Sequence, residues 1–569
     1  MRTVLMVVAV FLLGGWVMAK EKNTAQDSRI GNLSKLRREQ LSAKVSEIRS
    51  YLLEASIADT NAARLLSFVA ELEKEVRSKK YGLIFEGHKE RVDIELEENI
   101  PVLAENKKRF IDNGGEMNFL IEGDNLAALK LLEKTHRGKI DLIYIDPPYN
   151  TGNKDFIYND SFVDKTDGYR HSKWLSFMEK RLNIAKRLLS QKGVIFISID
   201  DNEQANLKLL CDGILGESNF VNQFIWKRNS SGKTEKDKFT VNTEYVLLYR
   251  KSSSCVLNAA YKPLAESSVK LYKHDDNDGR GKYQTVSLQK PSAPGPETTY
   301  DYIDNCGRVW KCPPKGWRMT YEKVKALEND NRLCFNGKTL RVKDYWNERA
   351  NEGKRIDTLW IDLPENTVAT KELSLLFDGE VVFTNPKPTD LIKRCLEVGY
   401  SNYAILDFFA GSGTTGHAVM KLNSEDGGKR KFILVTNNEN GICEKVTYER
   451  LKRVINKEKY AAKLKYFKVD YVPITEEGYW ERAEALLKYI RELVELENGI
   501  DFVHDKSVAI VLTDEEAVAL LKDRKRLAVC KTVYRGHNVM FSAKMNAQLS
   551  SCGIEVRMIP DYYYPELED

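Results

Sequence analysis

The segment DPPY at residues 146–149 places an acid, two prolines and an aromatic ring directly after an apolar run. Asp146 offers a carboxylate as a hydrogen-bond acceptor. Prolines on both sides of the next peptide fix φ and favour extended geometry before them, which sets the direction of the Pro147 carbonyl. Two acceptors on the N–H bonds of an exocyclic amine would favour a tetrahedral nitrogen with its lone pair pointing outward. Tyr149 adds a flat face for a nucleobase taken out of a duplex. The alternative is a strand that simply ends at prolines.

A second apolar run ends at Asp407 and leads into Gly411-x-Gly413-x-x-Gly416. Glycines let backbone N–H groups approach a ligand at the start of the following helix. The spacing matches the dinucleotide fingerprint, with Glu439 at about the offset of an acid that binds a ribose. Asp407 would repel a pyrophosphate, whereas S-adenosyl-L-methionine (AdoMet) carries an ammonium and a sulfonium. The residues favour AdoMet, and an NAD-dependent oxidoreductase is the alternative.

Apolar runs alternate with amphipathic helical segments from Asn118 to Trp226, and again beyond residue 381. Strands that are apolar throughout, alternating with helices, predict a parallel sheet covered on both faces. Residues 24–80 predict a charged helical hairpin that packs on the main body or on a second subunit. Beyond residue 473 we expect a charged helix and a small α/β tail from Ser507, without chemistry-bearing motifs.

Residues 227–318 interrupt the alternation and are basic. They contain 17 Lys or Arg against 10 Asp or Glu, together with ten Tyr, Trp or Phe. Lysines and arginines contact phosphates, and aromatic rings stack on bases. The composition favours a nucleic-acid contact region, and a solvated surface insertion is the alternative.

The chain of 569 residues predicts two or three domains. Its nine cysteines include no CxxC pair, which indicates reduced thiols in a cytosolic protein. The apolar run from Val4 to Ala19 conflicts with this, because it resembles a secretory signal, although it is too short for a confident membrane span. We expect a cytoplasmic enzyme with an extension that comes from an upstream start codon or is idle.

The motifs DPPYNTGNKDFIYND and DFFAGSGTT together resemble those of amino-group DNA methyltransferases of the permuted beta class, in particular modification (Mod) subunits of type III restriction-modification systems. In that class the DPPY half precedes target recognition and the AdoMet half follows. Here Asp146 precedes Asp407 by 261 residues, which is that order. The resemblance covers roughly residues 80–460 and implies an α/β Rossmann-like fold, with a doubly wound, mostly parallel sheet and permuted motif order.

The sequence patterns and the resemblance together predict a division of the chain into six regions. These are a signal-like extension at 1–23, a helical segment at 24–80, a catalytic half at 81–226, a target recognition region at 227–380, an AdoMet-binding half at 381–472 and a C-terminal accessory region at 473–569.

The resemblance implies two groups of site residues. The target adenine would be held by Asp146, Pro147 and Tyr149, with Pro148 shaping the turn. The cofactor group comprises Asp124, Phe383, Asn385, Lys387, Asp407, Phe409, Gly411, Gly413 and Glu439. Within it, Asp124 would reach the adenine of AdoMet and the FTNPKP segment would close over its methionine end. Glu439 would replace the acid that is common at the end of the strand FILVTN.

An Asp at the head of DPPY favours adenine N6 over cytosine N4 in this family. The resemblance implies methyl transfer to double-stranded DNA with base flipping and no metal, with a restriction subunit and a second copy as partners and no membrane. Three alternatives besides cytosine N4 stay open: the NAD-dependent oxidoreductase, a DNA-binding module without activity, and modification of RNA or protein amines.

Overall fold

The computed structural model describes most of the chain. The described residues are 33–55, 60–77, 83–152, 155–158, 161–231, 237, 239–258, 260–262, 270–291, 295–336, 339–348, 354–399, 404–474, 479–560 and 563. The chain divides into two compact units, Met1–Ile84 and Phe85–Asp569. The signal-like segment 1–23 lies outside the described residues. No helix within the described ranges has the length and apolar character needed to span a bilayer.

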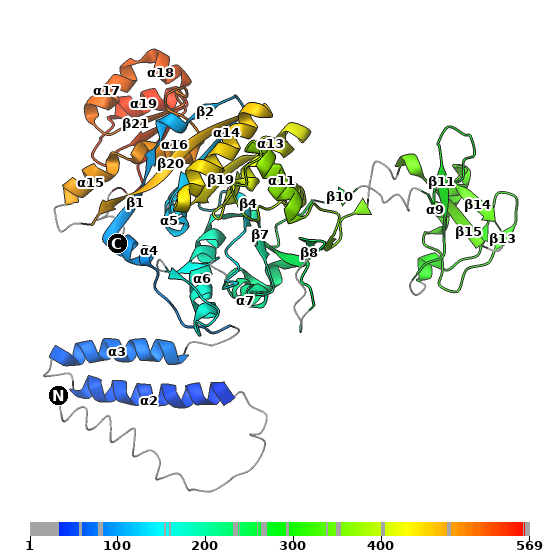
Figure 1. Cartoon of the computed structure of the whole chain (residues 1–569), viewed down its shortest axis with the longest axis horizontal. Coiled ribbons are helices and arrows are strands. Elements are labelled where there is room, and N and C mark those ends of the chain that lie inside the picture. The colour runs from blue at the N-terminus through cyan, green and yellow to red at the C-terminus, as the bar shows by residue number, and fades with distance from the viewer. Residues whose placement is uncertain are drawn as a thin grey trace, which may run out of the picture. The chain divides into compact units, whose positions relative to one another are not determined.

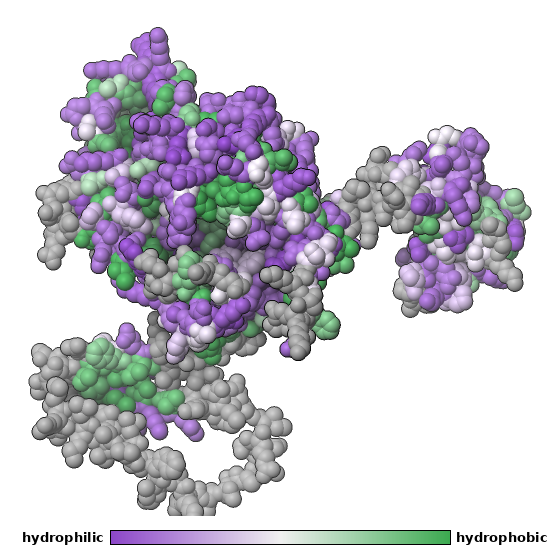
Figure 2. Space-filling model, viewed as in Figure 1, coloured by the Kyte–Doolittle hydropathy of each residue, from purple (hydrophilic) through white to green (hydrophobic). Residues whose placement is uncertain are grey.

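The first unit contains two helices that pack on each other, α2 (Leu33–Ala55) and α3 (Thr60–Arg77). Arg49 of α2 lies 3.2 Å from the Glu73 carboxylate of α3. These helices confirm the predicted helical hairpin. An apolar stripe of α3, including Phe68 and Leu72, is exposed (Figure 2). The packing partner of this stripe stays a prediction.

The second unit is built on a sheet of eleven strands with the order β1-β20-β3-β19-β18-β4-β7-β9-β8-β17, in which β2 also pairs with β20 (Figure 1). The run from β20 to β7 is parallel throughout. The strands are β1 (Asn99–Glu105), β2 (Ile111–Asp112), β3 (Glu116–Glu122), β4 (Ile140–Ile145), β7 (Leu189–Ile199), β8 (Phe220–Lys227), β9 (Thr243–Arg250), β17 (Leu359–Trp360), β18 (Ala404–Asp407), β19 (Lys431–Thr436) and β20 (Ala462–Pro473).

Both faces of this sheet are buried. Leu142 and Tyr144 of β4 lie in one apolar core with residues of α12, α13 and α14. Ile143 and Ile145 point to the opposite face, because side chains alternate along a strand, and they are also fully buried. The mostly parallel, doubly wound α/β fold is therefore confirmed.

Helices and short helical turns accompany the sheet. They are α4 (Arg91–Glu98), η1 (Lys107–Arg109), α5 (Asn125–His136), α6 (Arg170–Leu188), α7 (Gln204–Cys211), η2 (Asp212–Gly216), η3 (Glu217–Asn219), α11 (Asn366–Leu376), α12 (Thr389–Val398), α13 (Thr414–Asp426), η5 (Glu439–Gly441), η6 (Ile442–Tyr448), α14 (Glu449–Lys457), α15 (Tyr479–Leu487) and α16 (Ile490–Asn498). Helical spacing explains their burial: Leu451, Val454 and Ile455 of α14 share one buried face.

A separate lobe lies between β10 (Tyr261–Lys262) and β16 (Lys354–Arg355), which pair antiparallel. It has its own core of Leu288, Tyr302, Trp310, Trp317, Val324, Leu333 and Leu340. Its other elements are β11 (Tyr283–Ser287), η4 (Pro296–Thr298), β12 (Tyr302–Ile303), β13 (Val309–Trp310), α9 (Tyr321–Asn329), β14 (Leu333–Asn336) and β15 (Thr339–Tyr345).

The predicted recognition region 227–380 is therefore not one piece of structure. Its strands β9 and β17 belong to the central sheet. Val246 and Leu248 of β9 pack in the same core as β4, which explains why this segment stays with the sheet. Among the described residues of this region, the lobe between β10 and β16 has a core of its own.

The C-terminal tail forms the small α/β unit that its sequence predicts. Its parallel sheet has the order β21-β22-β23, and it buries a separate apolar cluster. The elements are β21 (Val508–Val511), α17 (Asp514–Lys522), α18 (Arg524–Val529), β22 (Thr532–Arg535), α19 (Ala543–Ser551) and β23 (Glu555–Met558). The single charged helix expected before this tail is two helices, α15 and α16, because the backbone leaves helical geometry at Tyr489. All nine cysteines are free thiols.

Candidate active site

The two motifs lie at the carboxyl ends of neighbouring parallel strands. In the register of β18 and β4, Ile405 pairs with Leu142 and Leu406 with Ile143. Asp407 ends β18, and Asp146 follows β4 directly. Ligands of open α/β sheets bind outside the carboxyl ends of the strands. The fold thus joins two segments that are 261 residues apart in sequence.

The DPPY loop is held from α6. The indole N–H of Trp174 donates to the carbonyl of Pro148 at 2.7 Å. Asn150 is fully buried in the left-handed region, with φ of 57°, and its amide donates to Glu203 at 2.6 Å. Within the described ranges, nothing donates to the carbonyl of Pro147. The role of that carbonyl as a second acceptor for an amine stays a prediction.

A cluster of charged and polar side chains surrounds Asp146. The Tyr149 hydroxyl lies 2.8 Å from Asp146 Oδ1 and 3.1 Å from Glu244 Oε2. The Lys387 ammonium contacts the same two oxygens, at 3.2 Å and 3.0 Å. Arg228 lies 3.0 Å from the other oxygen of Glu244. The carboxylate of the motif is therefore one member of a compact network.

Burial and charge oppose each other in this network. Burial raises the pKa of Asp146 above its usual range, although the Lys387 ammonium lowers it. Burial also raises the pKa of Glu244, but Lys387 and Arg228 outweigh it and hold that pKa below its usual range. The pKa of Tyr149 is well above its usual range because of burial and the two nearby carboxylates. Tyr149 is thus a hydrogen-bond donor at neutral pH.

The FTNPKP segment reaches both motifs. Phe383 lies against the glycine loop, since its Cζ is 3.5 Å from the place of a Cβ at Gly411. Asn385 is exposed, with φ of 54°. Lys387 is buried and points at Asp146 and Glu244. Its contacts place it with the DPPY group, whereas we expected it with the cofactor group.

The glycine loop is organised around Asp407. Its carboxylate accepts from the backbone N–H of Phe409 at 2.9 Å and from the Thr415 hydroxyl. Gly411 and Gly413 have φ angles of 49° and 79°, which favour glycine. Burial raises the pKa of Asp407 to about 7, against the two hydrogen bonds. Asp407 therefore shapes the loop through its own hydrogen bonds.

A buried arginine supports the same loop from α14. The Arg450 guanidinium donates to the hydroxyls of Thr414 at 2.7 Å and Ser412 at 3.2 Å. It also donates to Thr389, the first residue of α12, at 3.2 Å. Arg450 thus ties the glycine loop to the helix that follows the FTNPKP segment.

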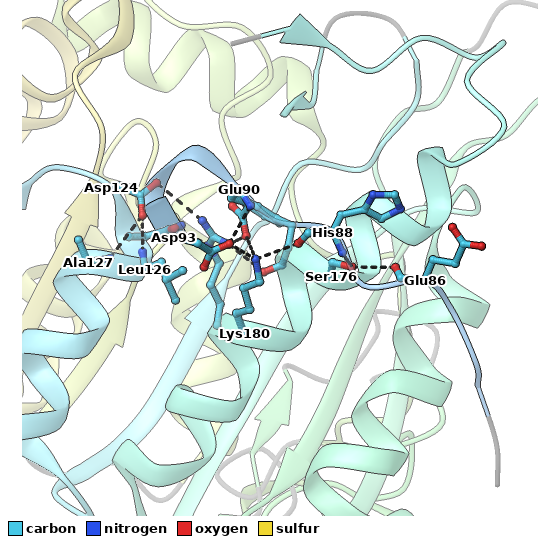
Figure 3. A network of polar contacts seen from close by, with 12 residues as sticks. Glu86, His88, Glu90, Asp93, Asp124, Leu126, Ala127, Ser176 and Lys180 are labelled. Carbon is cyan, nitrogen blue, oxygen red and sulfur yellow. Dashed lines mark hydrogen bonds and ion pairs between the residues drawn. The ribbon is translucent and has the colours of Figure 1, made fainter. Parts of the chain in front are cut away.

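Asp124 caps α5 next to a polar network that Figure 3 shows. Its Oδ1 accepts from the backbone N–H groups of Leu126 at 2.7 Å and Ala127 at 3.4 Å. Its Oδ2 lies 3.7 Å from Arg181, which also contacts Glu90 at 3.0 Å. The Asp124 side chain is about one-third exposed, with 38% of its surface accessible. It can reach a ligand while it caps the helix.

Lys180 of α6 extends this network toward the residues before α4. Its ammonium contacts Glu90 at 3.3 Å and also contacts Asp93 (Figure 3). Ser176 accepts from the backbone N–H of His88 and donates to the carbonyl of Glu86. The segment before α4 thus braces α6, which carries Arg181 and the Trp174 that holds DPPY.

Glu439 is exposed in the short turn η5. A buried acid near the end of β19 is Glu122, which ends the neighbouring strand β3. Its carboxylate accepts from the Tyr466 hydroxyl. Asn438 lies 3.4 Å from the same carboxylate. The role of Glu439 toward a ribose stays a prediction.

Sequence reasoning missed Glu244, Arg228, Trp174 and Arg450. Glu244 carried a signal, because it shares one face of β9 with the buried Val246 and Leu248. An acid on the apolar face of a strand is costly unless it is paired. Within the described ranges, no group of three or more His, Cys, Asp or Glu side chains is arranged to hold a metal ion.

Comparison with known proteins identifies the family of this site. The DNA methylase family model of the N6/N4 class matches residues 140–449, more than half of the chain. The chain belongs to the DNA methylase family. The matched range of the family begins at β4, spans both motifs and ends at the start of α14.

Three relatives are Mod subunits of type III restriction-modification enzymes. The StyLTI subunit of Salmonella typhimurium is 36% identical over 60% of this chain and 56% of its own length. The EcoPI subunit of Escherichia phage P1 is 31% identical over 71% of this chain and 68% of its own length. The EcoP15I subunit of Escherichia coli is 30% identical over 65% of this chain and 67% of its own length. The chain thus spans a little over half to about two thirds of these relatives.

Among solved structures, one similar chain is assigned as a DNA modification methylase of Thermus thermophilus, in complex with S-adenosyl-L-methionine. It is 14% identical, with a TM-score of 0.30, and the match covers 61% of this chain and 99% of that chain.

Proposed function

We propose that this protein is a site-specific DNA methyltransferase that transfers a methyl group from AdoMet to the N6 amine of adenine in double-stranded DNA. The observation that carries the proposal is the position of DPPY and the glycine loop at adjacent strand ends in a member of the DNA methylase family. The type III Mod relatives support the adenine assignment.

The glycine loop has the features that AdoMet needs. Gly411 and Gly413 leave the backbone open at the start of α13, and Phe383 lies over the loop. Asp124 presents a partly exposed carboxylate after the end of β3, which lies two strands from β18 in the sheet. When bound, AdoMet supplies an electrophilic methyl group. Asp407, Phe409, Asn385 and Glu439 are the further residues that we assign to this group.

The DPPY loop would hold the target amine. Asp146 and the Pro147 carbonyl accept its two N–H bonds, and Tyr149 stacks on the flipped base. Trp174 and Asn150 fix the loop before the base arrives. The residues thus contribute by positioning the amine and by stabilising the charge that develops on its nitrogen.

The test is product analysis. Purified chain, labelled AdoMet and mixed genomic DNA should yield N6-methyladenine on digestion and mass spectrometry. N4-methylcytosine would instead support the cytosine alternative, and label confined to RNA or protein would support those substrates. Titration with NAD in place of AdoMet tests the oxidoreductase alternative. Single-molecule sequencing of DNA from an expressing host would give the methylated site.

Asp146→Ala should abolish methylation, by at least about a thousandfold, because it removes an acceptor that the amine needs. AdoMet affinity should stay within about twofold of wild type, since Asp146 lies outside the glycine loop. Isothermal titration measures the affinity, and label transfer measures the rate. Retained methylation in this variant would refute the site assignment.

The partners belong to the same proposal. We propose double-stranded DNA as the substrate, a restriction subunit as a partner, a homodimer, and the cytoplasm as the site of action. Copurification of a restriction subunit from the native host and the mass of the assembly in solution test the two protein contacts.

A further inference from the structure

The two carboxylate oxygens of Asp146 differ in their hydrogen-bond and ion-pair partners. Oδ1 receives both the Tyr149 hydroxyl at 2.8 Å and the Lys387 ammonium at 3.2 Å. In the part of the chain that the structure describes, no group donates to Oδ2. A carboxylate oxygen has two lone pairs, so Oδ1 is saturated. The carboxylate is therefore anchored by one oxygen and open at the other.

Lys387 is fixed in place for this contact. It lies between Pro386 and Pro388, and all three residues are buried. A proline restricts its own φ and the conformation of the residue before it. The aromatic rings of Tyr149 and Trp226 flank the ammonium, at 4.9 Å and 5.8 Å from their centroids. The ammonium thus has little freedom to leave Asp146.

Glu244 holds the other side of the ammonium. Its Oε2 lies 3.0 Å from the Lys387 ammonium and 3.1 Å from the Tyr149 hydroxyl, whose single proton can point to Glu244 or to Asp146 Oδ1. Only 3% of its side chain is exposed, and Arg228 binds its second oxygen. Glu244 lies on β9 and Arg228 directly follows β8, so both lie outside the DPPY loop. The Lys387 ammonium therefore bridges the two carboxylates, and Tyr149 lies within reach of both.

We propose that Lys387 and Glu244 are positioning residues for methyl transfer: they hold Asp146 by Oδ1 and leave Oδ2 to accept an N–H of the target amine. This proposal rests on the proposed function. Tyr149 can give up its bond to Asp146 when a base stacks on it, because Glu244 is a second acceptor within reach. Lys387 then keeps Asp146 oriented and ionised.

This arrangement predicts opposite electrostatic effects. The charged and titratable groups that face Asp146 are Lys387, Glu244, Tyr149, Tyr144 and Asp407, with Arg228 behind Glu244. The Lys387 ammonium lowers the pKa of Asp146, and the Glu244 carboxylate raises it. Removing each charge should move that pKa in opposite directions.

The experiment compares the pH profiles of kcat/KM for wild type, Lys387→Met and Glu244→Gln. In Lys387→Met the acid limb should move to higher pH by about one unit or more, since an opposite charge at this distance shifts a pKa by about 1–3 units. In Glu244→Gln it should move to lower pH. AdoMet affinity should change less than about twofold in both. Limbs that stay in place, or that move in the same direction, would overturn the inference.

Lys208→Met is the matched control. Lys208 also pairs with a carboxylate, Asp212, at 2.7 Å and lies over two aromatic rings, Phe220 and Tyr249. It lies on α7, outside the site. This variant should leave the acid limb in place. A limb that moves equally in the control would show a general effect of losing a paired lysine and would overturn the inference.

A second readout needs no methyl transfer. Carboxyl ¹³C resonances of Asp-labelled protein without DNA report the titration of Asp146, which Asp146→Asn identifies. Opposite shifts in Lys387→Met and Glu244→Gln support the positioning pair, and unchanged titration refutes it. A wild-type chain that methylates no DNA would refute the proposed function alone, because this titration still decides the contact.

Discussion

Asp407 is almost completely buried, and its two oxygens accept hydrogen bonds from Phe409 of its own loop and from Thr415 of α13. An acid in such a place costs stability when it ionises, because burial disfavours the charged form. Burial raises the pKa of Asp407 to about 7, and the nearby Asp146 adds to the effect. At neutral pH the ionised form of Asp407 therefore destabilises the loop that we assign to the cofactor.

Asp407→Asn should change the pH dependence of stability. A carboxyl with a raised folded pKa contributes stability that is present below its unfolded pKa of about 4 and is lost as pH rises through about 7. Relative to the variant, the wild type should lose up to about 4 kcal/mol in free energy of unfolding between pH 4 and pH 8. Denaturant titrations of both proteins at several pH values measure the difference. A difference that is constant with pH would contradict the prediction.

The sequence predicts some residues of the site and conceals others. Asp146 and Tyr149 are visible because DPPY concentrates unusual residue types within four positions. Glu244 is not, because its partners Tyr149 and Lys387 lie 95 or more residues away and only the register of the strands brings them together. Lys387 was visible as part of FTNPKP, but the direction of its side chain depends on those same distant partners.

At the scale of elements, α14 supports the glycine loop through one side chain. Arg450 is 1% exposed, and burial lowers its pKa to about 10, so it stays charged at neutral pH. Its planar guanidinium serves Thr414, Ser412 and Thr389 at once. A lysine keeps the charge but cannot reproduce this fork of donors.

Arg450→Lys should therefore weaken AdoMet binding by about tenfold, which equals about 1.4 kcal/mol, while DNA affinity stays unchanged. Arg453→Lys is the control, because Arg453 lies on the same helix but pairs with Asp378, away from the loop. Isothermal titration with AdoMet and a DNA-binding assay give the two affinities. Equal losses in both variants would assign the effect to α14 in general.

The alternation of apolar and amphipathic segments predicted most elements of the sheet, including β3, β4, β7, β18 and β19. It could not show that Thr243–Arg250 continues the same sheet, because a strand's neighbours depend on pairing that its own residues do not specify. Local periodicity likewise favoured one helix where α15 and α16 are separate, since both halves have similar helical spacing.

At the scale of the whole molecule, the described residues on the two sides of the lobe in the sequence form one antiparallel strand pair, β10 with β16. Lys262 and Lys354 are direct partners across that pair, so the chain leaves and returns at nearly the same point. The lobe also has its own apolar core. It therefore meets the structural requirements of a separable unit.

Replacing residues 263–353 with a short glycine-rich turn should leave a folded protein that binds AdoMet as wild type does, because the central sheet and both motifs stay intact. Site-specific methylation should be lost, because the part of the basic, aromatic region that lies in the lobe, residues 263–318, would be gone. Isothermal titration and methylation of mixed genomic DNA measure the two properties. Loss of AdoMet binding would show that the lobe is part of the cofactor fold, and retained specificity would show that recognition lies elsewhere.

The strand order has a further consequence for the newly made chain. β3 and β4 are synthesised one after the other, yet β19 and β18 lie between them in the finished sheet. Roughly 260 residues separate β4 from β18, which takes on the order of 10–50 s at about 5–20 residues per second on the ribosome. During that time apolar strand edges lack their neighbours, and such edges invite aggregation. We expect a nascent chain of this kind to need protection by chaperones until its last parallel strands emerge.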